Sequence, residues 1–313
     1  MPELPEVETI RLGLSDFIIK QKIRKITVSC DKSFQGDREQ AIGATITDIR
    51  RFGKALVIDL DNQTSLLIHL RMTGQLIFDP AGPTADFVYS AGPPPARHAS
   101  TPTPTRFAAG HPSENFVATL PNRQTRVIIE LENGTLYFND QRKFGFIKSL
   151  ETTAVKEDSF IKKLAPEPWA ITPADFYARL KRHEKAPIKS VILDQTIIAG
   201  LGNIYADEAL FATKIHPARK CATITEREAK ALLESAKAVM EKSIASGGST
   251  MKDYVKADDT RGDYLDKFAQ VFNRTGEPCP RCKSTKIVKL RVAGRGTHIC
   301  PHCQTLKKEP SND

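Results

Sequence analysis

The chain has 313 residues, of which 40% are hydrophobic, which is enough for two or three domains with packed cores. No hydrophobic run approaches the length of a membrane-spanning helix, and the acidic, proline-containing start is unlike a secretory signal, so we expect a cytoplasmic protein. The formal charge of +9, from 46 basic and 37 acidic residues, favours a polyanionic partner, nucleic acid ahead of an acidic membrane surface, although a basic but otherwise ordinary enzyme would carry the same surplus.

The first predicted element is a helix near the start of the chain. Val7, Ile10, Leu14 and Phe17 recur at helical spacing and predict a helix over about residues 5–19. The proline and glutamates of the opening suit a helix start, because proline lacks an amide hydrogen and the helix dipole favours negative charge there.

Short segments rich in branched and aromatic residues follow and predict a β-rich domain. Asp61-Asn62 and Asn133-Gly134 separate them in pairs, which is typical of β-hairpins. The predicted strands are 55–60, 65–70, 125–131 and 134–140. Between the two pairs, residues 79–121 are rich in Pro, Ala, Gly, Ser and Thr and cannot bury much surface, so we expect a flexible insertion.

After about Thr172 the hydrophobic pattern becomes helical. The last helical segment begins with a capping box, Thr225 with Glu228, and stops at Gly247-Gly248. The predicted helical segments are 172–184, 187–195, 203–213 and 225–248.

Four of the six cysteines lie in two closely spaced pairs, Cys279-Pro-Arg-Cys282 and Cys300-Pro-His-Cys303, separated by 17 residues. Four thiolates at this spacing suit tetrahedral zinc in a closed, structural site. Clustered cysteines in a cytosolic protein favour metal over disulfides. Because this module is too small for an apolar core, we expect one structural Zn²⁺ to supply much of its stability.

The segment between the cysteine pairs alternates like a β-hairpin. Gly294 and Gly296 flank Arg295 at its turn, where an arginine can fork onto phosphates, although an exposed, solvated arginine is the common alternative. The whole pattern predicts an α+β multidomain chain with a β-rich domain and N-terminal helix over 1–150, a helical domain over 151–270, a zinc module over 271–305 and a polar tail over 306–313.

Several motifs, in order along nearly the whole chain outside the insertion, resemble those of the formamidopyrimidine-DNA glycosylase family. They are MPELPEVE, RRFGKALVI, IHLRMTG, NDQRKFG, APEPW, GLGNIYADEALF, SGGST and CPRC…GRGTHICPHC. The resemblance implies an N-terminal helix with a β-sandwich, a helix-two-turn-helix DNA-binding domain and a zinc finger built on a β-hairpin. It also implies a monomer with no membrane partner that excises oxidised purines, such as 8-oxoguanine and formamidopyrimidines, from duplex DNA in base excision repair.

The resemblance assigns the catalytic residues as well. Removal of Met1 would expose the secondary amine of Pro2, the implied nucleophile, which attacks the sugar to form a Schiff base. Glu3 is the implied general acid/base, and Glu6 is a helper or only a first-turn glutamate. β,δ-elimination then removes both flanking phosphates, so the implied enzyme is a glycosylase and abasic-site lyase together.

A base must leave the double helix to be reached, and something must fill the space it leaves. Met72, Arg142 and Phe144 match the family residues that do so and that contact the orphaned partner base. Without the resemblance, Met72 and Phe144 would be assigned to the core.

Further polar residues are implied to contact DNA. Lys54 and Arg295 hold phosphates beside the extruded nucleotide and therefore count as catalytic, although a solvated strand-end charge is the plain alternative for Lys54. Asn203 follows a glycine turn at a helix start, which suits phosphate binding and also ordinary capping. The remaining expected DNA contacts are Arg126, Lys143 and Lys189, and the expected lesion-recognition loop comprises Ser249, Thr250, Met251, Lys252, Asp253 and Tyr254.

Two other functions fit part of this pattern. The endonuclease VIII branch shares the nucleophile and the zinc module but prefers oxidised pyrimidines; Leu4 and the intact 142–144 loop favour the purine branch. A zinc-dependent DNA-binding protein without activity would need neither Pro2 nor Glu3 nor Lys54, all of which are present.

Overall fold

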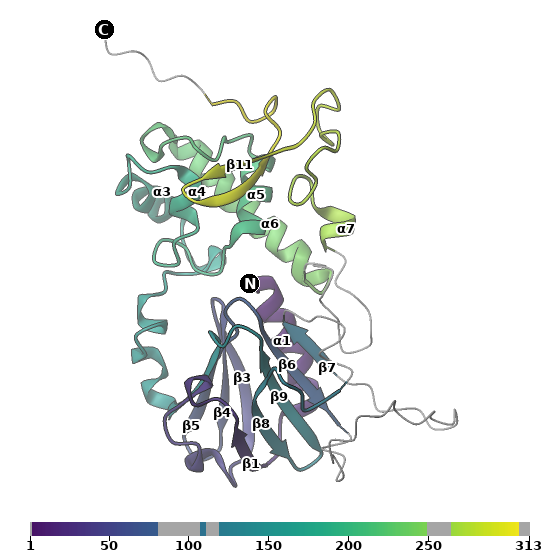
Figure 1. The fold of residues 1–313 in the computed structure, drawn as a ribbon. Coiled ribbons are helices and arrows are strands. Elements are labelled where there is room, and N and C mark those ends of the chain that lie inside the picture. Colours follow the sequence, from purple (N-terminus) through teal and green to yellow (C-terminus); the bar gives the residue numbers. More distant parts are fainter. Residues whose placement is uncertain (1, 81–106, 111–118, 249–263, 307–313) are drawn as a thin grey trace, which may run out of the picture.

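The computed structural model describes residues 2–80, 107–110, 119–248 and 264–306. A β-rich body and a helical body lie at opposite ends of the molecule, and the start of the chain lies at their junction (Figure 1). The α+β multidomain fold expected from the sequence is confirmed, with a β-sandwich, a helical domain and a small hairpin that carries the cysteines. Among the described residues, no helix combines the length and hydrophobicity needed to cross a membrane.

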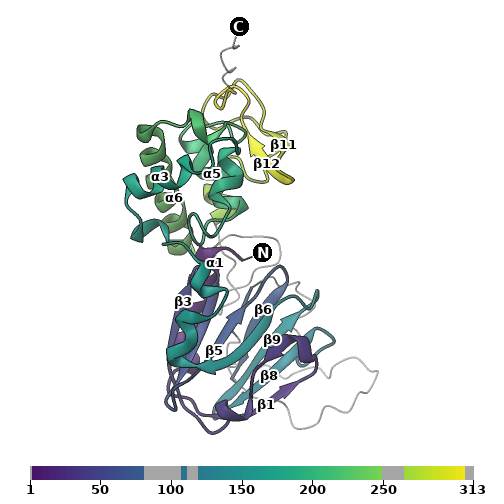
Figure 2. The same cartoon turned by 90° about the vertical axis from the view of Figure 1, so that its left-hand side faces the viewer.

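Two five-stranded sheets form the β-rich body (Figure 2). The first has the order β1 (Ile23–Val28), β8 (Thr125–Leu131), β9 (Gly134–Asp140), β6 (Gly74–Asp79) and β7 (Phe107–Gly110). The second has the order β2 (Phe34–Gln35), β10 (Phe146–Glu151), β5 (Thr64–His69), β4 (Ala55–Leu60) and β3 (Ile46–Phe52). The short β2 runs parallel to β10, and the other described pairings are antiparallel.

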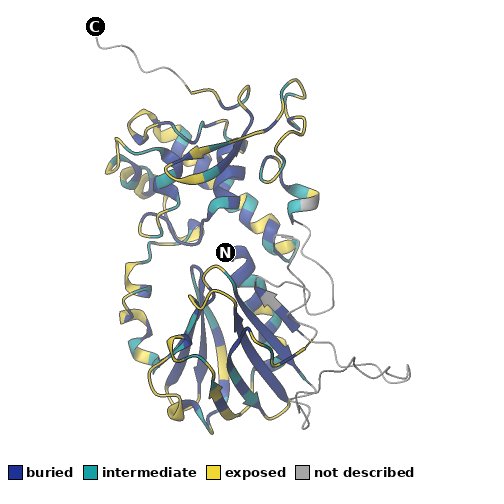
Figure 3. Cartoon of the chain, in the orientation of Figure 1, coloured by how far each residue is buried: buried dark blue, intermediate teal, exposed yellow. Residues whose placement is uncertain are grey.

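The core between the sheets receives side chains from both sheets and from α1 (Leu4–Ile18). Val7, Ile10 and Leu14 of α1 are buried in it, as their spacing predicts, and Phe17 packs against its edge. Both predicted hairpins are confirmed, since β4 pairs with β5 and β8 with β9. Figure 3 shows that burial runs along whole strands of this body, because elements outside the sandwich also cover the outer faces.

Part of the expected flexible insertion at 79–121 belongs to the first sheet, which corrects that expectation. Asp79 ends β6, and β7 pairs with β6 as an edge strand. Phe107 of β7 is buried beside Phe17, with ring centroids 6.0 Å apart. Gly13 permits this contact, because a Cβ at that position would lie 2.1 Å from the Phe107 ring.

The helical body contains α3 (Pro173–Lys181), α4 (Ile188–Ile192), α5 (Asn203–Ala212), α6 (Glu226–Ala245) and α7 (Tyr264–Phe268). Each predicted helical segment contains one of the first four. The predicted capping box of Thr225 and Glu228 opens α6, and Gly247 and Gly248 follow it with positive φ angles. The core of this body includes Leu4, so α1 contributes to both bodies.

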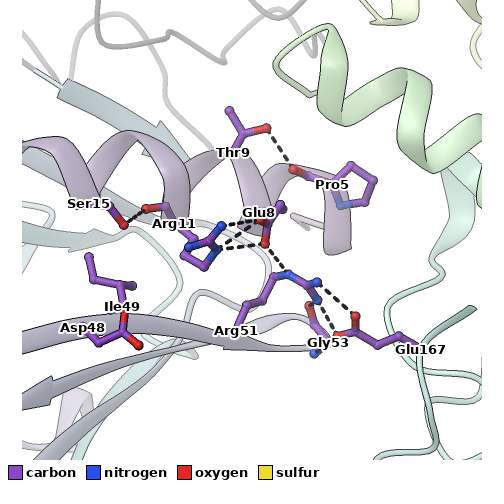
Figure 4. Close-up of polar contacts among 10 residues, drawn as sticks. All are labelled: Pro5, Glu8, Thr9, Arg11, Ser15, Asp48, Ile49, Arg51, Gly53 and Glu167. Atoms are coloured by element: carbon purple, nitrogen blue, oxygen red, sulfur yellow. Dashed lines mark hydrogen bonds and ion pairs between the residues drawn. The ribbon is translucent and has the colours of Figure 1, made fainter. Parts of the chain in front are cut away.

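An arginine at the end of β3 joins the two bodies (Figure 4). Arg51 donates from Nε to Glu8 of α1 at 2.7 Å and from both terminal nitrogens to Glu167, which lies on the segment leading to the helical body. Glu167 also accepts the backbone N–H of Gly53 at 2.9 Å. The cluster therefore connects α1, the turn that precedes Lys54 and the start of the helical body.

We expect Arg51→Ala to loosen this connection, because breaking a mostly buried ion pair leaves carboxylates without a partner. The expected loss of unfolding free energy is roughly 2–4 kcal/mol, with faster limited proteolysis near Glu167. Arg50→Ala is the matched control, since Arg50 pairs with Asp59 inside one sheet. Equal proteolysis of the two variants would contradict an inter-body role for Arg51.

Candidate active site

The start of the chain is buried between the two bodies. Pro2 and Glu3 are both buried, and the Leu4 N–H donates to the carbonyl of Gly200 at 3.2 Å. The Glu3 carboxyl reaches the first turn of α5, where Oε1 accepts the Ile204 N–H at 3.0 Å. The other oxygen, Oε2, is buried and has no hydrogen-bond partner among the described residues. A carboxyl oxygen left without a partner in this way is available to a bound substrate.

Two glycines make this close approach possible. A Cβ on Gly202 would lie 2.2 Å from the Glu3 carboxyl carbon, so only glycine fits there. Gly200 has φ +90° and would place a Cβ 2.3 Å from the Leu4 side chain. The GLG sequence before α5 is therefore explained by packing against the chain start.

Burial shifts the pKa values of two catalytic candidates, Glu3 and Lys54. Burial raises the pKa of Glu3 to about 7, against the opposing attraction of Lys54. Lys54 is itself buried and donates to the Leu201 carbonyl at 2.9 Å; desolvation lowers its pKa despite the nearby charges of Glu3 and Glu6. A carboxyl that is half protonated near neutral pH suits a general acid.

Glu6 supplies the hydrogen bond that fixes the chain start. Its Oε2 accepts the Glu3 N–H at 2.8 Å, and its Oε1 accepts the hydroxyl of Tyr205 at 2.5 Å. Tyr205 was not predicted as a site residue, because a tyrosine on an apolar helix is indistinguishable from a core residue in sequence. Glu6 therefore does more than interact favourably with the helix dipole, because it also binds the Glu3 N–H and the Tyr205 hydroxyl.

The raised pKa of Glu3 predicts a pH-dependent stability. Between about pH 4.5 and pH 7 the folded protein holds a proton that the unfolded chain releases, so stability falls as pH rises through this window. Glu3→Gln has no carboxyl to titrate and therefore removes this loss. The melting temperature of the variant minus that of wild type should be larger at pH 8 than at pH 5. Thermal denaturation at both pH values measures it, and a difference independent of pH would contradict it.

Two loops of the β-sandwich carry exposed apolar side chains. Met72, between β5 and β6, is 40% exposed and Phe144, between β9 and β10, is 57% exposed, which excludes the core as the place of either residue. The guanidinium of Arg142 lies 4.8 Å from the Phe144 ring centroid. Exposed apolar residues of this size suit insertion between bases.

Asp140 holds these two loops together, and sequence reasoning did not identify it. Its carboxylate accepts the Thr73 hydroxyl from one loop, and the N–H groups of Arg142 at 3.1 Å and Gly145 at 2.7 Å from the other. The residue is fully buried. Asp140 thereby fixes the loop of Met72 relative to the loop of Phe144.

Asp140→Ala should release both loops. We expect an affinity loss of about tenfold or more for a duplex with a lesion, since hydrogen bonds to a charged group contribute about 1.5–3 kcal/mol. Fluorescence anisotropy against lesion-containing and undamaged duplexes measures this. Asp61→Ala is the control, because Asp61 accepts the Thr45 N–H in a distant, exposed turn. Equal losses in the two variants would refute the role of Asp140.

Three further expected DNA contacts lie in the described part of the chain, two of them exposed and one partly buried. Arg295 is exposed as the first residue of β12 (Arg295–Ile299), after the turn from β11 (Val288–Val292), and its charge lowers the pKa of Lys54. Lys143 is exposed with φ +57°. Asn203 opens α5, and its Oδ1 is buried without a hydrogen-bond partner among the described residues.

Lys189 differs from its expected role as a DNA contact. It is 0% exposed, and its ammonium donates to Asp207 at 2.6 Å, Thr297 Oγ1 at 2.8 Å and the Gly296 carbonyl at 3.0 Å. All three protons are used inside the protein. We therefore interpret Lys189 as the link that joins α4 and α5 to the hairpin that carries Arg295.

Arg126 also differs from its expected role. It is buried, and its guanidinium donates to the carbonyls of Asp140 at 2.7 Å and Arg123 at 3.1 Å and to the Gln124 side chain at 3.2 Å. These internal acceptors favour a structural role beneath the loop of Arg142 over a direct phosphate contact. The expected lesion loop, Ser249 to Tyr254, lies outside the described residues.

The four clustered cysteines fit a zinc ion. The Sγ atoms of Cys279 and Cys303 are 3.9 Å apart and those of Cys282 and Cys300 are 3.7 Å apart, and all four lie within 4.8 Å of one another. Zn–S bonds of about 2.3 Å in a tetrahedron give sulfur separations of about 3.8 Å. The geometry of the four thiols thus fits the structural zinc predicted from the sequence.

Three family models match consecutive parts of the chain. The model for the formamidopyrimidine-DNA glycosylase N-terminal domain matches residues 1–147, and the model for the formamidopyrimidine-DNA glycosylase H2TH domain matches residues 164–255. The model for a zinc finger found in FPG and IleRS matches residues 276–306. Together they span most of the chain.

Whole proteins and solved structures are similar over nearly the full length. A formamidopyrimidine-DNA glycosylase of Listeria innocua is 36% identical over 97% of this chain and all of the relative, and one of Streptococcus pyogenes is 38% identical over 99% of this chain and all of the relative. The structure of the MutM (FPG) protein from Thermus thermophilus has a TM-score of 0.78 at 32% identity, covering 98% of this chain and all of that one. A Lactococcus lactis FPG mutant in complex with Fapy-dG-containing DNA has a TM-score of 0.80 at 32% identity, covering 97% and 100%.

Proposed function

This chain belongs to the formamidopyrimidine-DNA glycosylase family, and from that premise we propose how its residues act. It is a DNA glycosylase of base excision repair that acts on oxidised purines. The observation that carries the proposal is the buried Glu3 carboxyl, with a pKa of about 7, next to Pro2 and near the charge of Lys54. An inert DNA-binding protein has no use for such a carboxyl.

The proposed reaction begins at the amine of Pro2 once Met1 is removed. The nitrogen lone pair forms a bond to C1′ of the damaged nucleotide, the glycosidic bond breaks, and the base leaves with its electron pair and takes up the proton that the Pro2 nitrogen loses. The bond between C1′ and the ring oxygen then breaks as the iminium forms, and Glu3 gives its proton to that oxygen. Lys54 and Arg295 would hold the flanking phosphates.

The iminium makes the neighbouring sugar protons acidic. Loss of the C2′ proton expels the 3′ phosphate, and loss of the C4′ proton then expels the 5′ phosphate, so the strand is cut on both sides. The Glu3 carboxylate left after ring opening is the proposed base for the C2′ proton, and it passes that proton to water before it takes the C4′ proton. Water finally releases the sugar fragment and restores the Pro2 amine.

The remaining site residues bind and shape the DNA. We propose that Met72 and Phe144 fill the space left by the extruded nucleotide and that Arg142 contacts the unpaired base. Lys143 and Asn203 would bind phosphates, and residues 249–254 would read the lesion.

The zinc finger would keep Arg295 in place. Cys279, Cys282, Cys300 and Cys303 would hold the zinc, which supplies folding energy and no reaction step. Residues 1–150 would form the catalytic domain, 151–270 the helix-two-turn-helix domain and 271–305 the zinc finger. We further propose that the enzyme acts as a cytoplasmic monomer on duplex DNA containing oxidised bases or abasic sites.

Borohydride trapping tests the proposal. Reduction of the Schiff base should give a covalent complex of the protein with duplex DNA carrying 8-oxoguanine opposite cytosine, and Pro2→Gly should lower its yield by at least about tenfold, because a secondary amine is replaced by a primary one. A duplex with thymine glycol is the comparison substrate. No adduct with either duplex would refute a catalytic role, and a preference for thymine glycol would favour the oxidised-pyrimidine branch.

A further inference from the structure

One hydrogen-bonded chain at the junction has no part in the proposed reaction. Tyr205 of α5 is fully buried, and its hydroxyl lies 2.5 Å from Glu6 Oε1 and 2.5 Å from Ser243 Oγ of α6. Ser243 is also fully buried. Three elements that are distant in sequence thus meet at one phenol.

The direction of these hydrogen bonds follows from counting protons. A tyrosine hydroxyl has a single proton, which it donates to Glu6, so the Ser243 hydroxyl must donate to the tyrosine oxygen. The other oxygen of Glu6 accepts the N–H of Glu3 at 2.8 Å. The hydrogen bonds from the Ser243 hydroxyl, the Tyr205 hydroxyl and the Glu3 N–H therefore all point toward the Glu6 carboxylate.

We propose that Tyr205 is a positioning residue of the glycosylase reaction, which acts through Glu6 to hold the peptide that joins Pro2 to Glu3. The Glu3 nitrogen belongs to that planar peptide, so fixing its N–H fixes the plane and the Pro2 Cα with it. This inference rests on the proposed function of Pro2 and Glu3. It adds a residue that touches neither DNA nor the reacting atoms.

Several titratable groups lie near Glu6. Among the described residues they include Glu3, Lys54, Tyr205 and Tyr264. The negative charge of Glu6 helps to raise the pKa of Glu3, whereas Lys54 lowers it. The pKa of Tyr205 is raised well above its ordinary value by burial and by Glu6, so the phenol stays a donor at any physiological pH.

Loss of the Tyr205 hydroxyl should therefore slow the chemical step more than it weakens DNA binding. Glu6 would keep its hydrogen bond from the Glu3 N–H but lose the donor that fixes its other oxygen, so the peptide between Pro2 and Glu3 would be held less firmly.

Tyr205→Phe tests the inference, since it removes one oxygen and keeps the ring. We expect single-turnover excision of 8-oxoguanine to slow about tenfold or more at pH 7.5, with affinity for the duplex within about twofold. Ser243→Ala, which leaves the bond from Tyr205 to Glu6 in place, should slow excision less than Tyr205→Phe does.

Tyr137→Phe is the matched control, because Tyr137 is a buried tyrosine of β9 outside the junction. It should keep the wild-type rate and affinity. A Tyr205→Phe enzyme with the wild-type rate, or with an affinity for the duplex that falls as much as its rate, would overturn the inference while wild-type trapping still succeeds. A wild type that forms no adduct would overturn the proposed function and this inference with it.

Discussion

The structure depends on bringing one carboxyl group, that of Glu3, out of water and against the backbone that opens α5. Gly202 leaves no room for a side chain between them, and the Ile204 N–H binds one of the two oxygens. Burial disfavours the charged form of the carboxyl and so raises the pKa of Glu3 to about 7. The same contact therefore joins two bodies and prepares a proton donor.

Side chains on the first turns of α5 bind the elements that surround this contact. Tyr205 holds Glu6, Asp207 binds Lys189 and the His298 N–H of the zinc hairpin, and Glu208 accepts three consecutive N–H groups from residues 270–272. Neighbouring positions on one helix thus fix the chain start, the arginine-bearing hairpin and the entry to the zinc module. Strict spacing of these partners explains why the segment GLGNIYADEALF is so dense in buried polar residues.

Local patterns predicted much of this molecule, because their physical causes are local. The spacing of Val7, Ile10 and Leu14 and the paired cysteines needed no knowledge of distant contacts. Strand β7 was missed because its stability comes from pairing with β6 and from Phe107, inside a stretch whose composition indicates flexibility. Lys189 was expected at a DNA surface, since sequence reveals a positive charge but not the acceptors that surround it. Asp140 and Tyr205 were not recognised as site residues because their hydrogen-bond partners also cannot be read from the sequence.

Helix α1 is shared between two hydrophobic cores. Leu4 is buried with the helical body, while Val7 and the turns that follow are buried in the sandwich. Separating the two bodies into two polypeptides would leave a cavity in the core of the helical body and expose the apolar Leu4 side chain on the other piece. Both hydrophobic cores are therefore complete only when the two bodies are together.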